Sequence, residues 1–294
     1  MTLDEALAIV EASPDHRVLR RIKPPSGPVL AGHPSRIGLY VDCETTGLDH
    51  ATAEIIELAM IPFDYYDDGR IFGVGPAFHA YNEPRTPIAP EITKLTGITH
   101  EMVAGKCIDP GEVAAFMDGY GLVVAHNAAF DRPFLEAICP SFATIPWACS
   151  MSQVPWDEHG ISGRRLEYIA AALGSFYDAH NAVSDCQAGI HVLGATLTGG
   201  RTALAHLLDR ALLDTRRIWA IGAPFEKKDL LKARGYQWNG GEDGRAKAWH
   251  IEVAADGLDA EIAYLKSDIY CCGDRPTGGR ISTVTPRDRF TVRG

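Results

Sequence analysis

Residues 41–47 read Val-Asp-Cys-Glu-Thr-Thr-Gly, and they continue the apolar run Ile37–Cys43. An apolar run of this length is typical of a buried strand. Because side chains at i and i+2 of a strand point to one face, Asp42 and Glu44 should lie together at its end. Two neighbouring carboxylates repel each other and are costly to bury unless cations neutralise them. The stretch therefore indicates either a cation site or a strand end with two solvated acids.

Two further motifs each end in an acid near the beginning of an expected helix. Residues 126–131 read His-Asn-Ala-Ala-Phe-Asp, and residues 180–185 read His-Asn-Ala-Val-Ser-Asp. Taken singly, Asp131 and Asp185 are better explained as acids that favour a helix N-terminus. His180 taken singly is explained as an exposed loop residue.

The acids of the three motifs are more informative together. Four carboxylates occur in order, each at the edge of an expected element, and His180 precedes the last by five residues. Oxygen ligands suit Mg²⁺ or Mn²⁺ rather than zinc. Two such ions about 3.5–4 Å apart can bind the attacking and departing oxygens of a phosphodiester. A histidine titrates near neutral pH and can deprotonate the attacking water.

The motifs D-x-E-T-T-G, H-N-x-x-F-D and H-x-x-x-x-D resemble the DEDDh branch of the DnaQ-like 3′–5′ exonucleases, the family of polymerase III proofreading subunits and ribonuclease T. The resemblance spans about residues 36–198, and Ile55–Glu57, Leu95–Thr99 and Leu166–Gly174 match the family's usual intervening sequence. It implies a ribonuclease H-like mixed α/β sheet flanked by helices.

The resemblance also implies roles for individual residues. Two divalent cations, Mg²⁺ or Mn²⁺, would be held by Asp42, Glu44, Asp131 and Asp185, with His180 as the general base. The substrate pocket would be lined by Thr45, Thr46, Thr96, Gly97, Ile98, Asn127 and Phe130. Cys43 and Cys186 depart from the family's usual residues, and we expect the Cys43 side chain to point away from the metal ions.

The activity implied is hydrolysis of the 3′-terminal phosphodiester of single-stranded ends, releasing nucleoside 5′-monophosphates, with DNA preferred as the substrate. One alternative is an exoribonuclease, and another is a non-catalytic nucleic-acid-binding protein that retains the fold. A third is a proofreading subunit that works inside a polymerase assembly. We find no clamp-binding peptide after the nuclease region, which favours a free-standing nuclease in repair or RNA processing.

Charge is distributed unevenly along the chain, whose formal net charge is -10. Residues 36–200 contain 8 Lys/Arg against 21 Asp/Glu, whereas residues 201–294 contain 16 against 13. A simple nucleic-acid-binding protein would be basic throughout. An acidic central part instead suits carboxylates gathered around divalent cations, which supply positive charge for a phosphate substrate.

Pattern and composition predict four parts. Residues 1–35 form a helix and a linker; the helix opens with a T-x-x-E capping box at Thr2–Glu5, and the linker is rich in proline. Residues 36–200 form the exonuclease domain, with strands at 37–43, 55–66, 72–80 and 121–125. Residues 216–272 form a small α+β domain, and 273–294 are expected to be irregular.

The C-terminal stretch 224–249 contains the motif P-F-x-x-K-D-x-x-K-x-x-G-x-x-W, followed by K-x-W. It resembles a small domain of unknown function that recurs beside primase- and mobilisation-type proteins. Basic and aromatic residues alternate here, as in single-strand binding sites, although a small core built on two tryptophans explains them too. The residues are Lys227, Lys228, Lys232, Arg234, Tyr236, Trp238, Arg245, Lys247 and Trp249. We expect this domain to contact nucleic acid or a protein partner.

The first residues are acidic and no apolar segment follows, which predicts a cytoplasmic protein without a membrane segment. The seven cysteines show no C-x-x-C spacing, so we expect reduced thiols rather than disulfides or structural zinc.

Overall fold

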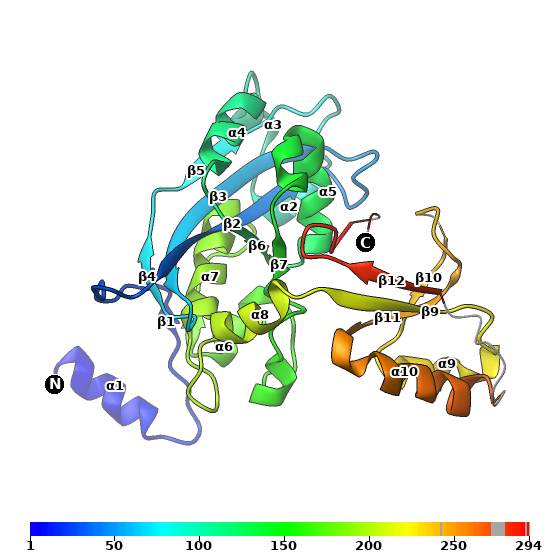
Figure 1. Cartoon of the computed structure of the whole chain (residues 1–294). Helices are drawn as coiled ribbons and strands as arrows, with labels where there is room; N and C mark the ends of the chain where they lie inside the picture. The colour runs from blue at the N-terminus through cyan, green and yellow to red at the C-terminus, as the bar shows by residue number, and fades with distance from the viewer. Residues whose placement is uncertain (242, 272–279, 292, 294) are drawn as a thin grey trace. The chain divides into compact units, whose positions relative to one another are not determined.

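A computed structural model describes residues 1–241, 243–271, 280–291 and 293. The chain divides into two units, Met1–Ala211 and Leu212–Gly294, and each is considered by itself (Figure 1). Within the described residues, no helix is long and apolar enough to span a membrane. The described cysteines are free thiols, most of them buried, and Cys272 lies outside the described residues.

The first unit is built on a mixed sheet with the strand order β4-β3-β2-β6-β7, and β5 also pairs with β3. Strands β2 and β3 are antiparallel, whereas β6 and β7 run parallel to β2. The strands are β2 (Ser35–Thr45), β3 (Ile55–Tyr66), β4 (Ile71–Val74), β5 (Phe78–Tyr81), β6 (Leu122–Ala125) and β7 (Trp147–Cys149). Three antiparallel strands followed by two parallel ones confirm the expected ribonuclease H-like sheet.

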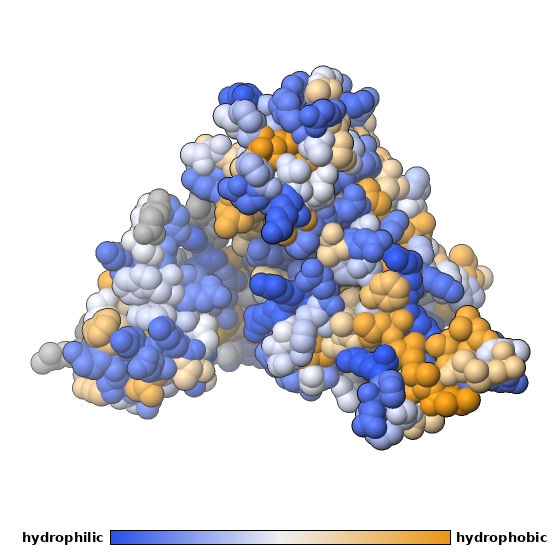
Figure 2. Space-filling model, turned by 180° about the vertical axis from the view of Figure 1, so that it is seen from behind, coloured by the Kyte–Doolittle hydropathy of each residue, from blue (hydrophilic) through white to orange (hydrophobic). Residues whose placement is uncertain are grey.

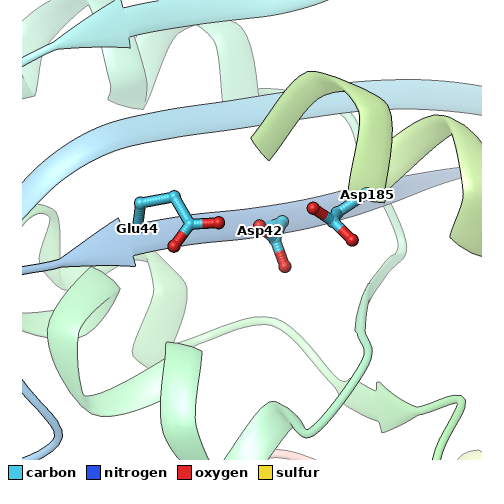
Figure 3. A group of neighbouring side chains, drawn as sticks. All are labelled: Asp42, Glu44 and Asp185. Carbon is cyan, nitrogen blue, oxygen red and sulfur yellow. The ribbon is translucent and has the colours of Figure 1, made fainter. Parts of the chain in front are cut away.

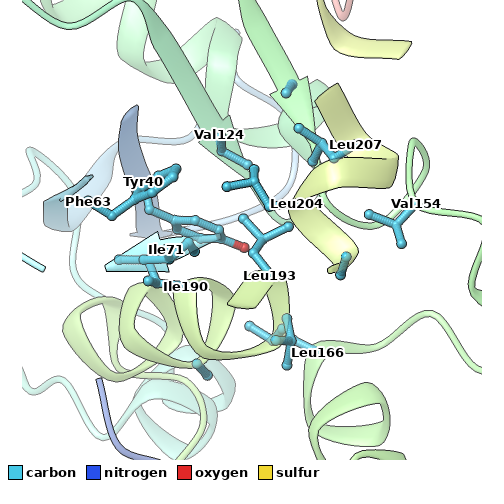
Figure 4. Packing of buried hydrophobic residues seen from close by; sticks show 14 of the residues in the cluster. Tyr40, Phe63, Ile71, Val124, Val154, Leu166, Ile190, Leu193, Leu204 and Leu207 are labelled. Atoms are coloured by element: carbon cyan, nitrogen blue, oxygen red, sulfur yellow. The ribbon is translucent and has the colours of Figure 1, made fainter. Parts of the chain in front are cut away.

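Helices cover both faces of this sheet. The face that carries Tyr40 and Val124 packs against α6 (Leu166–Ala172), α7 (Ala182–Gly194) and α8 (Ala203–Ala211), and together they form the main core (Figure 4). The other face carries Cys43 and Trp147 and contacts α5 (Ala128–Ile138). The remaining helices are α1 (Leu3–Glu11), α2 (Pro90–Thr96), α3 (His100–Val103) and α4 (Pro110–Met117), and a short two-stranded sheet joins β1 (Arg20–Arg21) to β8 (Ser175–Phe176).

The expectation of one strand over residues 72–80 is wrong, because the chain forms β4 and β5 instead. Gly75 and Pro76 separate them, and proline cannot donate a hydrogen bond to a ladder. The N–H of Gly75 donates to the carbonyl of Pro62, which lies in the middle of β3. The two short strands therefore pair with different halves of β3.

Helix α1 begins with the expected capping box between Thr2 and Glu5. None of its residues is buried, and Leu3 and Ile9 are 74% and 65% exposed. Figure 2 shows apolar residues gathered on the surface over this N-terminal segment. The packing of the sheet therefore does not depend on this helix.

Helix α7 lies unusually close to the sheet. A Cβ atom on Gly189 would be 2.0 Å from the Cζ atom of Tyr40, so only glycine fits there. One turn earlier, the Cys186 thiol lies 3.7 Å from the carbonyl oxygen of Tyr40 and 3.6 Å from that of Ala59. Asp185 directly precedes Cys186, so this contact also fixes the distance between Asp185 and β2.

The second unit is a four-stranded antiparallel sheet with the order β10-β11-β9-β12. Its elements are β9 (Thr215–Ala220), α9 (Lys228–Ala233), β10 (Gln237–Asn239), β11 (Ala248–Ala254), α10 (Leu258–Tyr264) and β12 (Arg280–Val284). The expectation of an irregular tail is wrong for Arg280–Val284, which pairs with β9. Ile281 aligns with Ile218, and the pairing partner, not the local composition, makes this segment a strand.

We predict that Gly189→Ala destabilises the protein, because the added methyl group must displace either α7 or the ring of Tyr40. The expected loss is about 1–3 kcal/mol in the free energy of unfolding, measured by urea denaturation. Gly121→Ala is the matched control, since a Cβ there meets nothing within 4 Å. Adding Tyr40→Leu to Gly189→Ala should recover part of the loss. A Gly189→Ala variant as stable as the wild type would contradict the packing described.

Candidate active site

Three of the four expected acids meet at one point. Asp42 and Glu44 project from β2, and Asp185 projects from α7 toward them (Figure 3). One oxygen from each of these carboxylates lies within 4.8 Å of the others. The i, i+2 spacing on β2 places Asp42 and Glu44 on the face that α7 covers. The group is arranged as a set of oxygen ligands for a cation.

Asp131 lies beside this group but is held differently. It is only 2% exposed, and its Oδ1 accepts hydrogen bonds from the Cys43 N–H (3.2 Å) and the Cys43 thiol (3.4 Å). The Cys43 side chain was expected to point away from the metal ions, and its thiol contacts the one expected acid that lies outside the group of three. Asp131 lies in the first turn of α5, which begins at Ala128 after Asn127 in a left-handed conformation.

Burial and mutual repulsion raise the pKa values of these acids. Burial first, and then the charges of Asp131 and Asp185, raise the pKa of Asp42 well above its usual value. Burial raises the pKa of Glu44 to about 7, with the charge of Asp185 adding to the shift. Burial also raises the pKa of Asp131 to about 7, against the hydrogen bonds from Cys43. Keeping these carboxylates ionised therefore costs free energy, and a bound cation would remove this cost.

Both oxygens of Asp185 are oriented by neighbours. The Tyr177 hydroxyl donates to Oδ1 at 2.8 Å, and the N–H of Asn181 donates to Oδ2 at 3.0 Å. Burial raises the pKa of Asp185, whereas the Tyr177 hydrogen bond opposes this shift. Tyr177 belongs to none of the three motifs, so its sequence gives no sign of this role.

His180 lies on the loop immediately before α7. Its φ of 63° is in the left-handed region, which is uncommon for residues other than glycine and recurs at functional sites. Its Nε2 lies 3.5 Å from Oε1 of Glu167, and both side chains are exposed by 46%. Its charge lowers the pKa of Asp185, so the ring lies near the acidic group.

Glu57, expected only as part of the family's intervening sequence, has a structural role. It is fully buried on β3, directly opposite Glu44 in the strand register. It accepts hydrogen bonds from His79 Nε2 (2.7 Å), from the Asn181 side-chain amide (3.3 Å) and from the N–H of Ala182 (3.1 Å). Ala182 is the first residue of α7, so Glu57 joins that helix to the strand beside β2. An acid within an otherwise apolar run was the available signal.

The hydroxyl groups of the threonines expected to line a substrate pocket bond to backbone groups of their own segments. The Thr45 hydroxyl donates to the carbonyl of Gly47 at 2.6 Å, and the Thr46 hydroxyl accepts from the N–H of Glu54 at 2.9 Å. The Thr96 hydroxyl likewise donates to the carbonyl of Ile92 at 3.0 Å. These bonds shape the turns that end β2 and α2.

The other expected pocket residues lie in four different settings. Gly97 ends α2 in a left-handed conformation with φ 75°, and Ile98 is buried against Ile56 and Val103. Asn127 is exposed, and the half-buried Phe130 ring packs 5.2 Å from that of Phe134. The structure thus places Ile98 in a core.

His126 of the second motif is fixed by its neighbours. Its Nδ1 lies 2.9 Å from the Ser150 hydroxyl, and its Nε2 lies 2.7 Å from the carbonyl oxygen of Arg164. Burial lowers its pKa to about 4. The ring therefore joins the end of β6 both to Ser150, directly after β7, and to Arg164, just before α6.

Comparisons with known proteins identify the family of the first unit. The family model described as Exonuclease matches residues 39–193, more than half of the chain. The chain therefore belongs to this exonuclease family, and the expected DnaQ-like 3′–5′ exonuclease domain, a hydrolytic nuclease, is confirmed.

Two relatives illustrate the match. The chain is 30% identical over 169 residues to DNA polymerase III subunit epsilon of Treponema pallidum. The matched region covers 54% of this chain and 75% of that protein. The chain is 31% identical over 174 residues to the PolC-type DNA polymerase III of Clostridium perfringens, covering 56% of this chain but only 12% of the polymerase. A solved structure of exonuclease X in complex with 5′ overhanging duplex DNA has a TM-score of 0.40 at 25% identity, covering 52% of this chain and 87% of that one.

We predict that the metal-free protein loses stability as the pH rises from about 4 to about 7. Glu44 and Asp131 have pKa values of about 7 in the folded state, above their unfolded values near 4. The folded state therefore binds more protons, and its advantage disappears as these acids ionise. Thermal melts from pH 4 to pH 8 with a chelator present measure this loss.

The variant Asp42→Asn should melt higher than the wild type at pH 8 without metal, because one repelling charge is gone. Asp118→Asn, at an exposed acid on the end of α4, is the control and should change little. Two results together would show that the acids do not repel one another as described. The wild-type melting temperature would rise between pH 4 and pH 7 with chelator present, and Asp42→Asn would melt no higher than the wild type at pH 8.

Proposed function

We propose that this protein is a 3′–5′ exonuclease that removes nucleoside 5′-monophosphates from single-stranded DNA ends. The convergence of Asp42, Glu44 and Asp185, with Asp131 beside them, carries the proposal. A binding protein gains nothing from clustered acids that repel phosphate, whereas a metal-dependent nuclease requires them. DNA is preferred to RNA because the relatives with the matching domain are named as DNA polymerase III proteins.

The donor set fits divalent cations. The charges that act most strongly on Asp42 are all carboxylates. Among the described residues, no lysine or arginine forms an ion pair with any of the four acids. An all-oxygen set suits Mg²⁺ or Mn²⁺. Asp42, Glu44, Asp131 and Asp185 would hold two such ions, which supply Lewis-acid stabilisation of the phosphodiester oxygens.

The side chains around the acids have separate tasks in this proposal. His180 accepts the proton of the attacking water; with Nε2 directed toward Glu167, we assign Nδ1 as the accepting atom. The Glu167 carboxylate then stabilises the protonated ring. Tyr177 and Glu57 keep Asp185 and the beginning of α7 in place. The Thr45–Gly47 turn and the turn at Thr96 and Gly97 would approach the terminal nucleotide, with Asn127 and Phe130 near Asp131.

The first test is degradation of single-stranded oligonucleotides. With a 5′ label, Mg²⁺ or Mn²⁺ should produce a ladder that shortens from the 3′ end, and with a 3′ label the first product should be a mononucleotide. Chelator should abolish both signals, and Asp42→Asn should lower the rate by at least about a thousandfold, because an essential metal ligand is lost. DNA and RNA of one sequence are compared directly.

Three results would refute the proposal: shortening from the 5′ end, activity that survives chelation, or wild-type rates in Asp42→Asn. Faster degradation of RNA than of DNA would support the exoribonuclease alternative.

The second test distinguishes a catalytic role of His180 from a role in stabilising the fold. His180→Asn removes the imidazole, while asparagine tolerates the left-handed backbone at this position. We expect the rate to fall by about 10²–10⁴-fold with the melting temperature unchanged. His16→Asn, at an exposed histidine of the N-terminal segment, is the matched control and should retain full activity. Full activity in His180→Asn would exclude the proposed role.

A further inference from the structure

The second unit presents aromatic rings and lysines in alternation. Phe225 is 74% exposed, and the Lys228 ammonium lies 4.3 Å from the centre of its ring. Lys232 follows Lys228 by one helical turn of α9, so both lie on one face of that helix. The Lys232 ammonium lies 5.9 Å from the ring centre of Trp249.

Trp249 continues this pattern onto the sheet. It is paired with Trp238 across β10 and β11, and the two rings meet edge to face at 5.5 Å. Trp238 is 50% exposed. We call the set Phe225, Lys228, Lys232, Trp249 and Trp238 the aromatic–lysine row.

Core packing does not account for the row. The core of the second unit is formed by Ile218, Ala220, Leu231, Tyr236, Leu265 and Ile269, with the half-buried Trp249 packed against it. Trp238 and Phe225 belong to neither group, although large aromatic rings are costly to leave in water. Their exposure beside lysines therefore calls for a ligand with flat apolar faces and negative charge.

We propose that the aromatic–lysine row binds single-stranded nucleic acid, with bases stacked on Trp238 and Phe225 and phosphates near Lys228 and Lys232. Base stacking on aromatic rings combined with a basic surface is the recurring chemistry of such sites. Charge agrees: residues 225–238 contain four Lys/Arg and two Asp/Glu, within a segment that is net positive in an acidic protein. This is a binding function that needs no cleavage and goes beyond the proposed nuclease site.

The test uses a circular single-stranded oligothymidylate with a fluorescent label. A circle has no 3′ end, so it cannot occupy an exonuclease pocket as a substrate, and a chelator prevents cleavage. Fluorescence anisotropy with the full chain should show binding. Trp238→Ala and Phe225→Ala should each weaken it about tenfold through lost stacking, whereas Trp238→Phe should retain most of the affinity.

The lysines are tested by the dependence of affinity on salt. Replacing both Lys228 and Lys232 with glutamine should reduce the slope of log affinity against log salt by about 1.4, which corresponds to two phosphate contacts with a single strand. Leu230→Ala is the matched control, because Leu230 is a 47% exposed residue of α9 outside the row.

The outcomes distinguish this proposal from the nuclease proposal. If the circle does not bind, or if Trp238→Ala, Phe225→Ala and the double lysine variant bind it as tightly as Leu230→Ala, the row is not a nucleic-acid site. A surface for an acidic protein would then be the remaining interpretation. Degradation of a linear strand by the same variants reports on the nuclease site separately, so either proposal can fail while the other stands.

Discussion

The distance between α7 and the sheet is set by the contact of Gly189 with the ring of Tyr40. No side chain at position 189 would allow the helix to come as close to β2. Because Asp185 is one turn away on the same helix, this approach brings its carboxylate to Asp42 and Glu44. The acidic group therefore depends on a packing contact between apolar surfaces, and the residues that make this contact have no part in the chemistry.

The same closeness creates an electrostatic cost. Burial and repulsion raise the pKa values of the acids, so the metal-free site favours protonated carboxyls. Hydrogen bonds from Tyr177 and Asn181 hold Asp185 in place, and Glu57 binds the beginning of α7 from the neighbouring strand. The fold thus holds a set of carboxylate oxygens close together. A bound cation would neutralise their charges and so remove the cost of bringing them together.

Much of the fold could be predicted because the signals were local. The strand Ile55–Tyr66 is an apolar run between turn residues, and its observed bounds match the expected ones. The errors occur where partners decide the structure. Gly75 and Pro76 divide the expected third strand, and Arg280–Val284 becomes a strand only because β9 offers a free edge. The local composition of residues 280–284 does not show that such an edge is available.

For the site, the sequence alone determined which acids could meet, because spacing on a strand and position near a helix start restrict where Asp42, Glu44 and Asp185 can point. The roles proposed for them follow from the family resemblance. The tertiary structure decided which side chains hold these acids. Glu57 and Tyr177 come from distant segments, and nothing in their local sequence shows that they end beside α7. Hydrogen bonds between distant segments are fixed by how closely the layers pack, and that distance is a property of the folded core.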